Sequence, residues 1–477
     1  MSRQVLILHG WSDDSRSFEP LAAFLAAAGY APRGIWLGDY VSKDDDLRVE
    51  DVATRMAQAI DDMIARQVLD PGFDMIVHST GALVARSWLT TRHRHDVARG
   101  PLKRLVMLAP ANHGSRLAAA GKSLLGRVVK GYDNWFESGQ AMLDDLELSS
   151  PFQWELARRD LLVAPGDDPG PRYYGADLVW PFVIVGTHPY ADRLRRITNE
   201  DGGDGTVRVC AANLNALGAT IDFGADRPVL QRWASRLECD APLAVLPTRT
   251  HGSIVDPKRV LPASRERIAE TDDEMAVLGD LILEALACDS FASYRDIGAR
   301  WHARSEATAA RRAAPPPGAR PEFFHQYLQV NVEARDDHGR QVPDYFLEFF
   351  SDPRTADDDG DVYLHASVLE DVKTNTRDPS LRNLFFDRTD LMDGHYAALP
   401  PGTARALRMS VSAAAPGRNV AYFASEKTGA KGDVVLHLGD DGAPRWLRRN
   451  TTHYVRIVVP RRPARRVFGL RRPAPEA

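Results

Sequence analysis

The stretch FDMIVHSTGALVAR, residues 73–86, changes from a strand pattern to a helix pattern around one serine. Residues 73–78 are mostly apolar, as in a buried strand, and the residues after the turn are good helix formers. The turn itself contains only Ser79, Thr80 and Gly81. A serine on so tight a strand-to-helix turn is held at the end of a sheet with its hydroxyl exposed. We therefore expect a parallel α/β sheet that presents Ser79 as a candidate nucleophile.

A second apolar run, LILHGW at residues 6–11, reads as another strand of this sheet. It ends in His9 and Gly10, where a backbone N–H can be left pointing into a cleft. The N–H of Trp11 and that of Thr80 are therefore the expected donors to a negatively charged oxygen.

Two later turns offer the acid and the base that a reactive serine needs. NEDGGDGTV, residues 199–207, contains Asp204, and THGSIV, residues 250–255, contains His251. A serine hydroxyl becomes nucleophilic near pH 7 only beside a neutral imidazole that a carboxylate holds in the useful tautomer. The chain order Ser79, Asp204, His251 is the order in which an α/β sheet of this kind presents the three groups.

Each of these assignments has a competitor. Ser79 could be an ordinary helix N-cap. Asp201 stands in the same acidic turn as Asp204, and we favour Asp204 because it lies in the motif GDGTV. His188 also follows a strand, but it precedes the acid, so we favour His251 as the base.

Taken in order, these motifs resemble the α/β-hydrolase superfamily, and more narrowly its lipases and its phospholipid-cleaving or acyl-transferring branch. The resemblance rests on HGW at 9–11, HSTG at 78–81, APANHGS at 109–115 and GDGTV at 203–207, and covers roughly the first 300 residues. It implies a catalytic triad of Ser79, Asp204 and His251, an oxyanion hole of the Trp11 and Thr80 N–H groups, and a substrate pocket that includes His9, Gly10, His78, Gly81 and His113.

One position departs from the family pattern Gly-x-Ser-x-Gly. Val77 stands in place of the first glycine, while Gly81 is kept. A small residue is usual there because the strand and the following helix nearly touch, so valine implies a slightly wider turn. His78 and His113 lie close to this turn. We expect them to be structural, donating to backbone groups or shaping the pocket wall.

Composition limits the alternatives. A chain of 477 residues is too long for one ordinary core, so two domains are expected. Hydrophobic content of 44%, charged content of 26% and a net charge of -5 are ordinary for a globular protein and give no reason to expect nucleic-acid binding.

Three scattered cysteines favour free thiols in a reducing compartment. With no secretory signal and no apolar run of membrane-spanning length, we expect a cytoplasmic protein, although export without a cleaved signal stays open.

The pattern of elements divides the chain into two parts. Residues 1–300 alternate strand-like and helix-like runs, which predicts a doubly wound, mostly parallel sheet. Residues 116–175 interrupt the alternation with short amphipathic helices rich in large apolar residues, which form either a fixed cap or a mobile lid. Residues 301–322 are a helical and Pro-rich linker.

The last part, residues 323–460, has the pattern of a sandwich-like domain of short antiparallel strands. The expected strands are Tyr327–Glu333, Tyr345–Phe350, Val362–Leu369, Leu407–Ser412, Val420–Ser425, Asp433–Leu438 and Tyr454–Val459. The acidic turn at 357–361 lacks the twelve-residue calcium-loop pattern, so a solvated hairpin turn is favoured. Residues 461–477 form a basic tail that could approach anionic lipid or simply be solvated.

These observations predict a serine hydrolase of carboxylic esters, most of all lipid or phospholipid acyl esters, with an acyl-enzyme on Ser79 and no metal or organic cofactor. The expected partners are the lipid or small ester substrate and a membrane surface contacted through the C-terminal domain and tail. An acyltransferase with the same triad, and a non-catalytic scaffold whose β domain binds a partner, are the alternatives.

Overall fold

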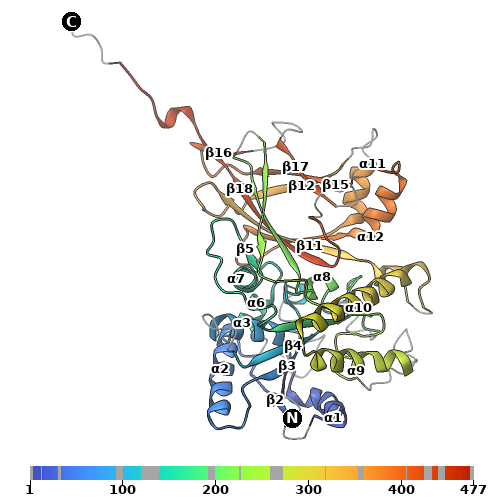
Figure 1. Cartoon of the computed structure of the whole chain (residues 1–477). Coiled ribbons are helices and arrows are strands. Elements are labelled where there is room, and N and C mark those ends of the chain that lie inside the picture. The colour runs from blue at the N-terminus through green and yellow to red at the C-terminus, as the bar shows by residue number, and fades with distance from the viewer. Residues whose placement is uncertain are drawn as a thin grey trace.

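The computed structural model describes residues 4–11, 13–30, 34–92, 100–119, 139–191, 199–224, 227–257, 272–316, 319–352, 359–403, 405–423, 432–438 and 446–472. An α/β body lies at one end of the molecule and a β-rich part at the other (Figure 1).

The body contains one six-stranded sheet in which neighbouring strands are parallel, in the order β10-β6-β4-β3-β1-β2. Its strands are β1 (Val5–Leu8), β2 (Ile35–Gly38), β3 (Phe73–His78), β4 (Leu102–Leu108), β6 (Trp180–Gly186) and β10 (Leu243–Leu246). Every residue of β1 and β3 is buried, as the uninterrupted apolar runs require in a sheet covered on both faces. The predicted doubly wound parallel sheet is confirmed.

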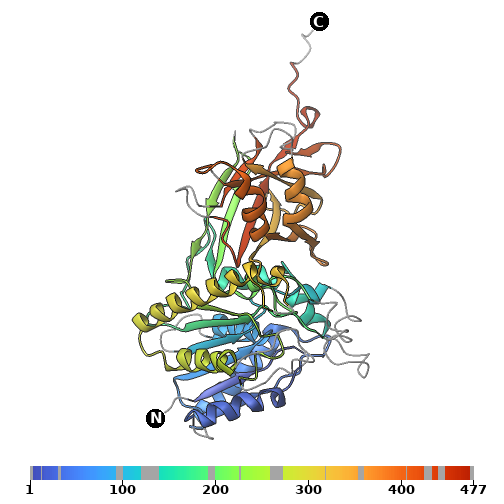
Figure 2. The ribbon, with the colours of Figure 1, turned by 90° about the vertical axis from the view of Figure 1, so that its right-hand side faces the viewer.

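Helices cover both faces of this sheet. The helices α2 (Val49–Ala65) and α3 (Gly81–Arg92) pack on one face, and α1 (Glu19–Ala27), α9 (Asp272–Ala287) and α10 (Phe291–Ala310) on the other. Because side chains alternate along a strand, Leu8 joins the core beneath α2 and α3, while its neighbour Ile7 joins the core beneath α1, α9 and α10. Figure 2 shows α9 and α10, in yellow, lying across one side of the body.

The insertion between β4 and β6 is helical where it is described. It contains α4 (Arg116–Ala119), α6 (Gln140–Leu146) and α7 (Pro151–Asp160), which ends in the short strand β5 (Leu162–Val163). Met142, Leu143 and Trp154 are buried in the same core as α2 and α3, so these helices pack firmly on the body. Residues 120–138 of the expected helical insertion 116–175 lie outside the described residues.

The β-rich part has two facing sheets. The larger has the order β13-β14-β11-β18-β7-β8 and the smaller β12-β15-β17. Their strands are β7 (Ala216–Asp222), β8 (Val229–Arg232), β11 (Tyr327–Asp336), β12 (Tyr345–Asp352), β13 (Leu369–Thr374), β14 (Leu381–Asp387), β15 (Ala406–Ala413), β17 (Val434–His437) and β18 (Thr451–Val459). Val332 of the larger sheet and Met409 of the smaller one belong to the same core, so the sandwich-like fold is confirmed.

The larger sheet also takes in a segment from the middle of the chain. Strand β18 lies between β11 and β7 and runs parallel to both, although the sequence pattern indicates antiparallel strands. Residues 216–232, assigned from sequence to the first part of the chain, therefore complete a sheet of the last part. A division of the chain near residue 300 stays a prediction.

One expected strand is wrong. Residues 359–368, which include most of the expected strand Val362–Leu369, form the helix α11 (Asp359–Tyr363) and a π-helical turn (Leu364–Val368). Leu364 and Val368 are buried four residues apart, whereas Val362 is 66% exposed. Burial with that spacing is helical rather than alternating, so packing against the sandwich core decides the conformation. The hairpin turn expected at 357–361 is wrong where it is described, because residues 359–361 begin α11; residues 357–358 lie outside the described residues.

Among the described residues, no helix combines the length and apolar character needed to cross a membrane. Strand β19 (Arg461–Pro463) pairs with β16 (Val420–Tyr422). After β19 the chain leaves the β-rich part through a segment that extends away from the molecule (Figure 1).

Candidate active site

The turn between β3 and α3 holds Ser79 in a left-handed backbone conformation, with φ of 53°. Only a few per cent of residues other than glycine adopt this conformation, and it costs on the order of 1–3 kcal/mol. The turn is fixed on both sides, because Ser79 N–H donates to Leu108 O at 3.1 Å and Ala82 N–H donates to Ser79 O at 3.1 Å. The serine is therefore presented by a strained but well-supported turn.

Two glycines allow the first strand to run against this turn. A Cβ added to Gly81 would lie 2.7 Å from the backbone oxygen of His9, and a Cβ added to Gly10 would lie 2.7 Å from the Cβ of Ser79. Backbone cannot yield at that distance, so both positions require glycine. Val77, the departure from the family pattern, is fully buried and lies opposite Leu8 and Met107 in the sheet. The expected widening of the turn stays a prediction.

The structure brings together the three residues that the chain order singles out. Ser79 Oγ lies 3.0 Å from His251 Nε2, and His251 Nδ1 lies 2.9 Å from Asp204 Oδ2. Both contacts have hydrogen-bond length, so a continuous chain of hydrogen bonds links the serine to the carboxylate. The backbone N–H of His251 also donates to Asp204 O at 2.9 Å, which ties the two loops together.

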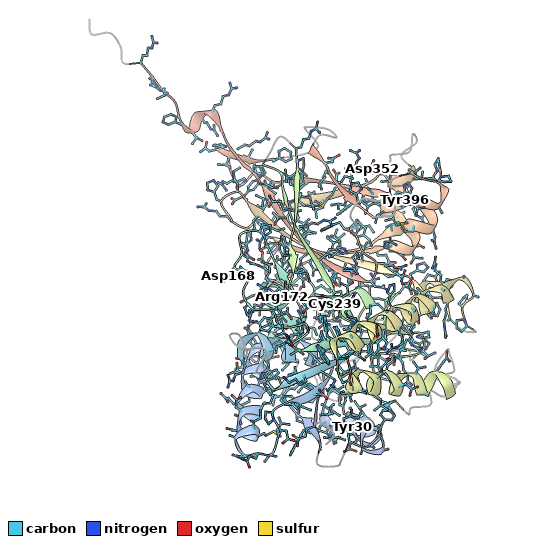
Figure 3. All side chains as sticks on the ribbon, in the orientation of Figure 1. Tyr30, Asp168, Arg172, Cys239, Asp352 and Tyr396 are labelled. Carbon is cyan, nitrogen blue, oxygen red and sulfur yellow. The ribbon has the colours of Figure 1, made fainter. Side chains whose placement is uncertain are left out.

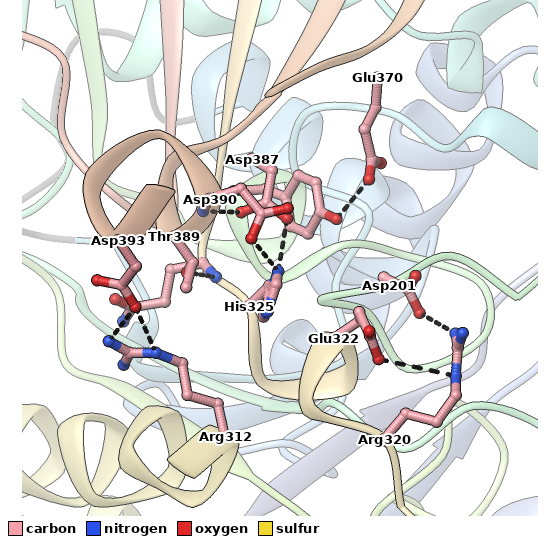
Figure 4. Close-up of polar contacts among 12 residues, drawn as sticks. Asp201, Arg312, Arg320, Glu322, His325, Glu370, Asp387, Thr389, Asp390 and Asp393 are labelled. Atoms are coloured by element: carbon pink, nitrogen blue, oxygen red, sulfur yellow. Dashed lines mark hydrogen bonds and ion pairs between the residues drawn. The ribbon is translucent and has the colours of Figure 1, made fainter. Parts of the chain in front are cut away.

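Asp204 is fully buried and its second carboxylate oxygen is also occupied. Oδ1 accepts the backbone N–H groups of Thr206 and Val207 at 3.0 and 2.8 Å. Hydrogen bonds to both oxygens hold the carboxylate in one orientation. Asp201, the competing acid, instead pairs with Arg320 at 2.7 Å (Figure 4).

The two N–H groups expected to bind an oxyanion are available. Neither the backbone N–H of Trp11 nor that of Thr80 donates a hydrogen bond to any described residue. Thr80 directly follows the serine, and Trp11 follows the glycine that touches it. Unpaired backbone donors beside a nucleophile are what an oxyanion hole requires.

His78 contacts the base rather than the serine. Its Nε2 lies 3.0 Å from the backbone oxygen of His251, and the two imidazole rings lie 4.7 Å apart. Burial, with the charge that His251 can carry, lowers the pKa of His78 well below its usual 6.5. A neutral His78 donates its Nε2–H to that carbonyl and keeps a second positive charge away from the base.

The other histidines are held by separate contacts. His9 is buried, stacks on Tyr40 at 4.3 Å and accepts the Tyr40 backbone N–H at 3.1 Å. His188 is buried near Phe323 with a ring separation of 6.5 Å. The imidazole that lies within hydrogen-bond distance of Ser79 Oγ is that of His251.

His113 reveals a partner that sequence reasoning missed. Its Nδ1 lies 3.0 Å from the hydroxyl of Tyr454 on β18, and its Nε2 lies 2.9 Å from the backbone oxygen of Asn213. A strand near the end of the chain thus supports the loop that contains His113. That loop lies beside the serine, because Ala111 N–H donates to Ser79 O at 3.3 Å. A lining role for His113 in a substrate pocket stays a prediction.

A buried ion pair behind the site was also missed. Arg86 of α3 binds Asp160 of α7 through two hydrogen bonds of 2.7 and 3.0 Å, and donates to Asn112 O at 2.7 Å. The signal was present in the sequence, because Arg86 interrupts an otherwise apolar and small helix face. Arg86 thus joins α3 to the insertion through Asp160 and to the loop before His113 through Asn112.

Among the described residues, one group has the composition of a metal site: His325, Asp387 and Asp390. His325 Nδ1 lies 2.6 Å from Asp387 Oδ2 and 3.6 Å from Asp390 Oδ1 (Figure 4). Burial acts to lower the pKa of His325, but the hydrogen bond and charge of Asp387 outweigh it and raise the pKa above 6.5. A charged imidazole paired in this way is a structural ion pair that joins the segment before β11 to the end of β14.

Comparisons with known proteins agree with this geometry. A family model described as "Alpha/beta hydrolase family" matches residues 5–263, while no curated protein sequence matches the chain. The solved structure of phospholipase PlaB from Legionella pneumophila is 25% identical, with a TM-score of 0.79, and the match covers 100% of this chain and 97% of that one. PlaB in complex with thio-NAD gives a TM-score of 0.78 over the same shares at the same identity. A lipase from Bacillus licheniformis, BlEst2, matches at 15% identity and a TM-score of 0.37 over 54% of this chain and 87% of that one.

Proposed function

Because the chain belongs to the alpha/beta hydrolase family, we propose that it is a serine hydrolase that cleaves carboxylic esters of lipids through an acyl-enzyme on Ser79. One observation carries the proposal: the hydrogen-bonded path from Ser79 Oγ through His251 to Asp204 at a strained turn. An ordinary helix N-cap would need neither a histidine at its hydroxyl nor a buried carboxylate behind it.

In the first half of the reaction, Ser79 Oγ attacks the acyl carbon while His251 Nε2 takes the hydroxyl proton. The carbonyl oxygen becomes an oxyanion, which the Trp11 and Thr80 N–H groups bind. Each such donor contributes on the order of 3 kcal/mol in comparable sites. When the tetrahedral intermediate collapses, the bond to the leaving oxygen breaks, and that oxygen takes the proton from His251 Nε2.

In the second half, water attacks the Ser79 ester and gives its proton to His251. The second tetrahedral intermediate releases the carboxylic acid, and Ser79 Oγ takes the proton back from His251. Asp204 holds the tautomer of His251 that carries its proton on Nδ1 and stabilises the imidazolium during both steps. All of these steps use groups of this chain and water.

Phospholipid is the proposed substrate class. The support is the similarity to PlaB over nearly the full length of both chains, since PlaB is described as a phospholipase. Whether the insertion acts as a fixed cap or a moving lid concerns dynamics, and its buried Met142 and Trp154 favour the fixed cap.

The test is Ser79→Ala with p-nitrophenyl esters and mixed phospholipid vesicles. The variant should lose turnover and labelling by a fluorophosphonate probe, while keeping the wild-type unfolding temperature. Unchanged turnover would refute the role of Ser79. Added glycerol separates hydrolysis from acyl transfer: a glyceride product in place of free acid would identify an acyltransferase, and probe labelling would exclude the scaffold alternative.

We also propose that the basic tail brings the enzyme to anionic membranes. Phe468 and Leu470 are 77% and 90% exposed and stand among arginines in residues 461–472. Near an anionic lipid surface, each arginine contributes roughly 1 kcal/mol of attraction. The double variant Phe468→Ser with Leu470→Ser should reduce sedimentation with vesicles containing anionic lipid. Equal sedimentation of variant and wild type would end this proposal.

A further inference from the structure

The loop that carries Asp204 has a short stem. Gly203 and Arg208 pair as an isolated antiparallel bridge, and within the loop Asp204 N–H donates to Val207 O at 3.1 Å. Asp204 and Arg208 are therefore joined by a few residues of tightly bonded backbone. A shift of Arg208 would be passed on to the carboxylate that holds His251.

Arg208 is buried against the β-rich part. Its side chain is only 3% exposed, and its guanidinium lies over the rings of Tyr327 and Phe385, 4.1 and 4.5 Å from their centroids. Tyr327 begins β11, and Phe385 belongs to β14. Figure 3 shows side chains crowding the junction between the α/β body and the β-rich part, where Cys239 is labelled. A guanidinium is attracted to aromatic faces, so these rings attach the stem to the larger sheet.

The other side of the stem meets the same tyrosine. A Cβ added to Gly202 would clash with the ring of Tyr327 and lie 2.8 Å from the backbone oxygen of His325. Gly202 also has φ of 67°, a conformation that favours glycine. Tyr327 therefore contacts both sides of the stem and leaves it no room to move toward the sheet.

One carboxylate of the β-rich part orients the arginine. Arg208 Nη2 donates to Glu370 Oε2 at 2.5 Å, and the Tyr327 hydroxyl donates to Glu370 Oε1 at 2.7 Å (Figure 4). Among the described residues, Nε and Nη1 of Arg208 have no hydrogen-bond acceptor. Glu200 lies further from the guanidinium, at 4.0 Å, and pairs with Arg116 at 2.9 Å. Glu370 thus supplies the hydrogen bond that fixes the guanidinium.

We propose that Glu370 is a positioning residue for the acid of the triad, because it holds Arg208 and, through the stem, Asp204. Since Asp204 matters to the reaction only if Ser79 is the nucleophile, this role rests on the proposed function. Without Glu370, the described carboxylate left near the guanidinium is that of Glu200. A buried charge that loses its partner is strongly unfavourable, so Arg208 turns toward Glu200 and displaces the stem.

The test is Glu370→Ala in the full-length chain, assayed with a p-nitrophenyl ester. Its kcat should fall by about 10-fold to 10²-fold, since small displacements of catalytic groups have effects of this size. KM should change by less than about threefold, because Glu370 acts on Asp204 and not on the substrate. Glu370→Gln should restore kcat to within about threefold of wild type, because its amide offers an oxygen to Arg208 and an N–H to the Tyr327 hydroxyl.

The matched control is Glu333→Ala. Glu333 is a buried carboxylate further along β11 and pairs with Arg335 and Arg456 at 2.6 and 2.7 Å. Its loss should lower the unfolding temperature at least as much as the loss of Glu370, yet leave kcat unchanged. Equal losses of kcat in the two alanine variants would overturn the positioning role.

A second readout does not depend on turnover. A proton shared between His251 Nδ1 and Asp204 gives a downfield proton NMR signal when the two groups are aligned. Wild type and Glu333→Ala should show the same signal, whereas Glu370→Ala should shift or lose it. If the wild type cleaved no ester, the proposed function would fail while this signal still tested the positioning. An unchanged signal in folded Glu370→Ala would overturn the inference.

Tyr327→Phe keeps the test decisive if Glu370→Ala does not fold. It removes one hydroxyl, and with it the hydrogen bond that holds Glu370 Oε1, while the ring stays beside Arg208. Its kcat should fall about fivefold, with a shift of the same NMR signal. Wild-type kcat together with an unshifted signal in this variant would also refute the role of Glu370.

Discussion

Replacing Asp204 with asparagine should change one hydrogen bond while leaving the shape of the acid loop intact. The side-chain oxygen of asparagine can accept the N–H groups of Thr206 and Val207, which now donate to Asp204 Oδ1 at 3.0 and 2.8 Å. The amide nitrogen then takes the place of Oδ2, 2.9 Å from His251 Nδ1. Since an amide N–H donates, His251 must accept at Nδ1 and carry its proton on Nε2, facing Ser79.

A histidine in that tautomer cannot take the serine proton. In comparable triads the same change lowers kcat by about 10⁴-fold, which corresponds to roughly 5 kcal/mol of transition-state stabilisation. Because Asp204 is fully buried behind His251, we expect it not to contact the substrate, and KM should stay close to the wild-type value. Steady-state hydrolysis of a p-nitrophenyl ester measures both constants, and the unfolding temperature confirms that the variant is folded.

The matched control is Asp201→Asn, in the same turn and with the same chemical change. Asp201 pairs with Arg320 on the surface, so its variant should keep kcat within about threefold, as is usual for an exposed ion pair. If the folded Asp204 variant kept kcat within tenfold of wild type, the tautomer argument would be refuted. A large loss in the Asp201 variant alone would transfer the role of the acid to that residue.

Two further perturbations test the supports of the site. Burial lowers the pKa of His453, on β18, to about 4, whereas a histidine in an unfolded chain has a pKa of about 6.5. Unfolding below pH 6.5 therefore takes up a proton at this residue. Lowering the pH from 7 to 4 should reduce the free energy of unfolding by about 3 kcal/mol through His453. Urea unfolding at pH 7, 5.5 and 4.5 measures this, and equal free energies would contradict it. Gly81→Ala should lower kcat/KM by about 10²-fold, because its Cβ would press on the backbone oxygen of His9 and displace the turn. Gly417→Ala, where the Cβ meets nothing within 4 Å, is the control, and equal losses in both glycine variants would remove the steric explanation.

The α/β body could be predicted because its signals are local. Strand β3 was predicted as Phe73–His78, with the bounds that the structure has, since an apolar run ends at an abrupt turn. Ser79, Asp204 and His251 follow from strand-end motifs in a fixed order, and the structure brings them within hydrogen-bond distance. Their chemical roles remain the proposal that the variants above test.

The β-rich part was harder to predict because its signals are distant. Strand β7 pairs in parallel with β18, more than 200 residues away, and no short-range pattern announces such a partner. Strand β14 was missed because Arg382 and Asn383 interrupt its apolar pattern, although Asn383 is buried and donates to Asn331 at 2.8 Å. In each case the contact that decides the structure comes from a segment far along the chain.

The position of β18 has a consequence for biosynthesis. During translation, β7 emerges from the ribosome long before residues 451–459 exist, so its edge on that side has no strand to bond to for most of the chain's synthesis. An open edge is a site for pairing with other nascent chains, which makes this interval the time when a chaperone would matter most. A premature stop codon between His251 and Thr451 would make that exposure permanent, even though every catalytic candidate had already been made.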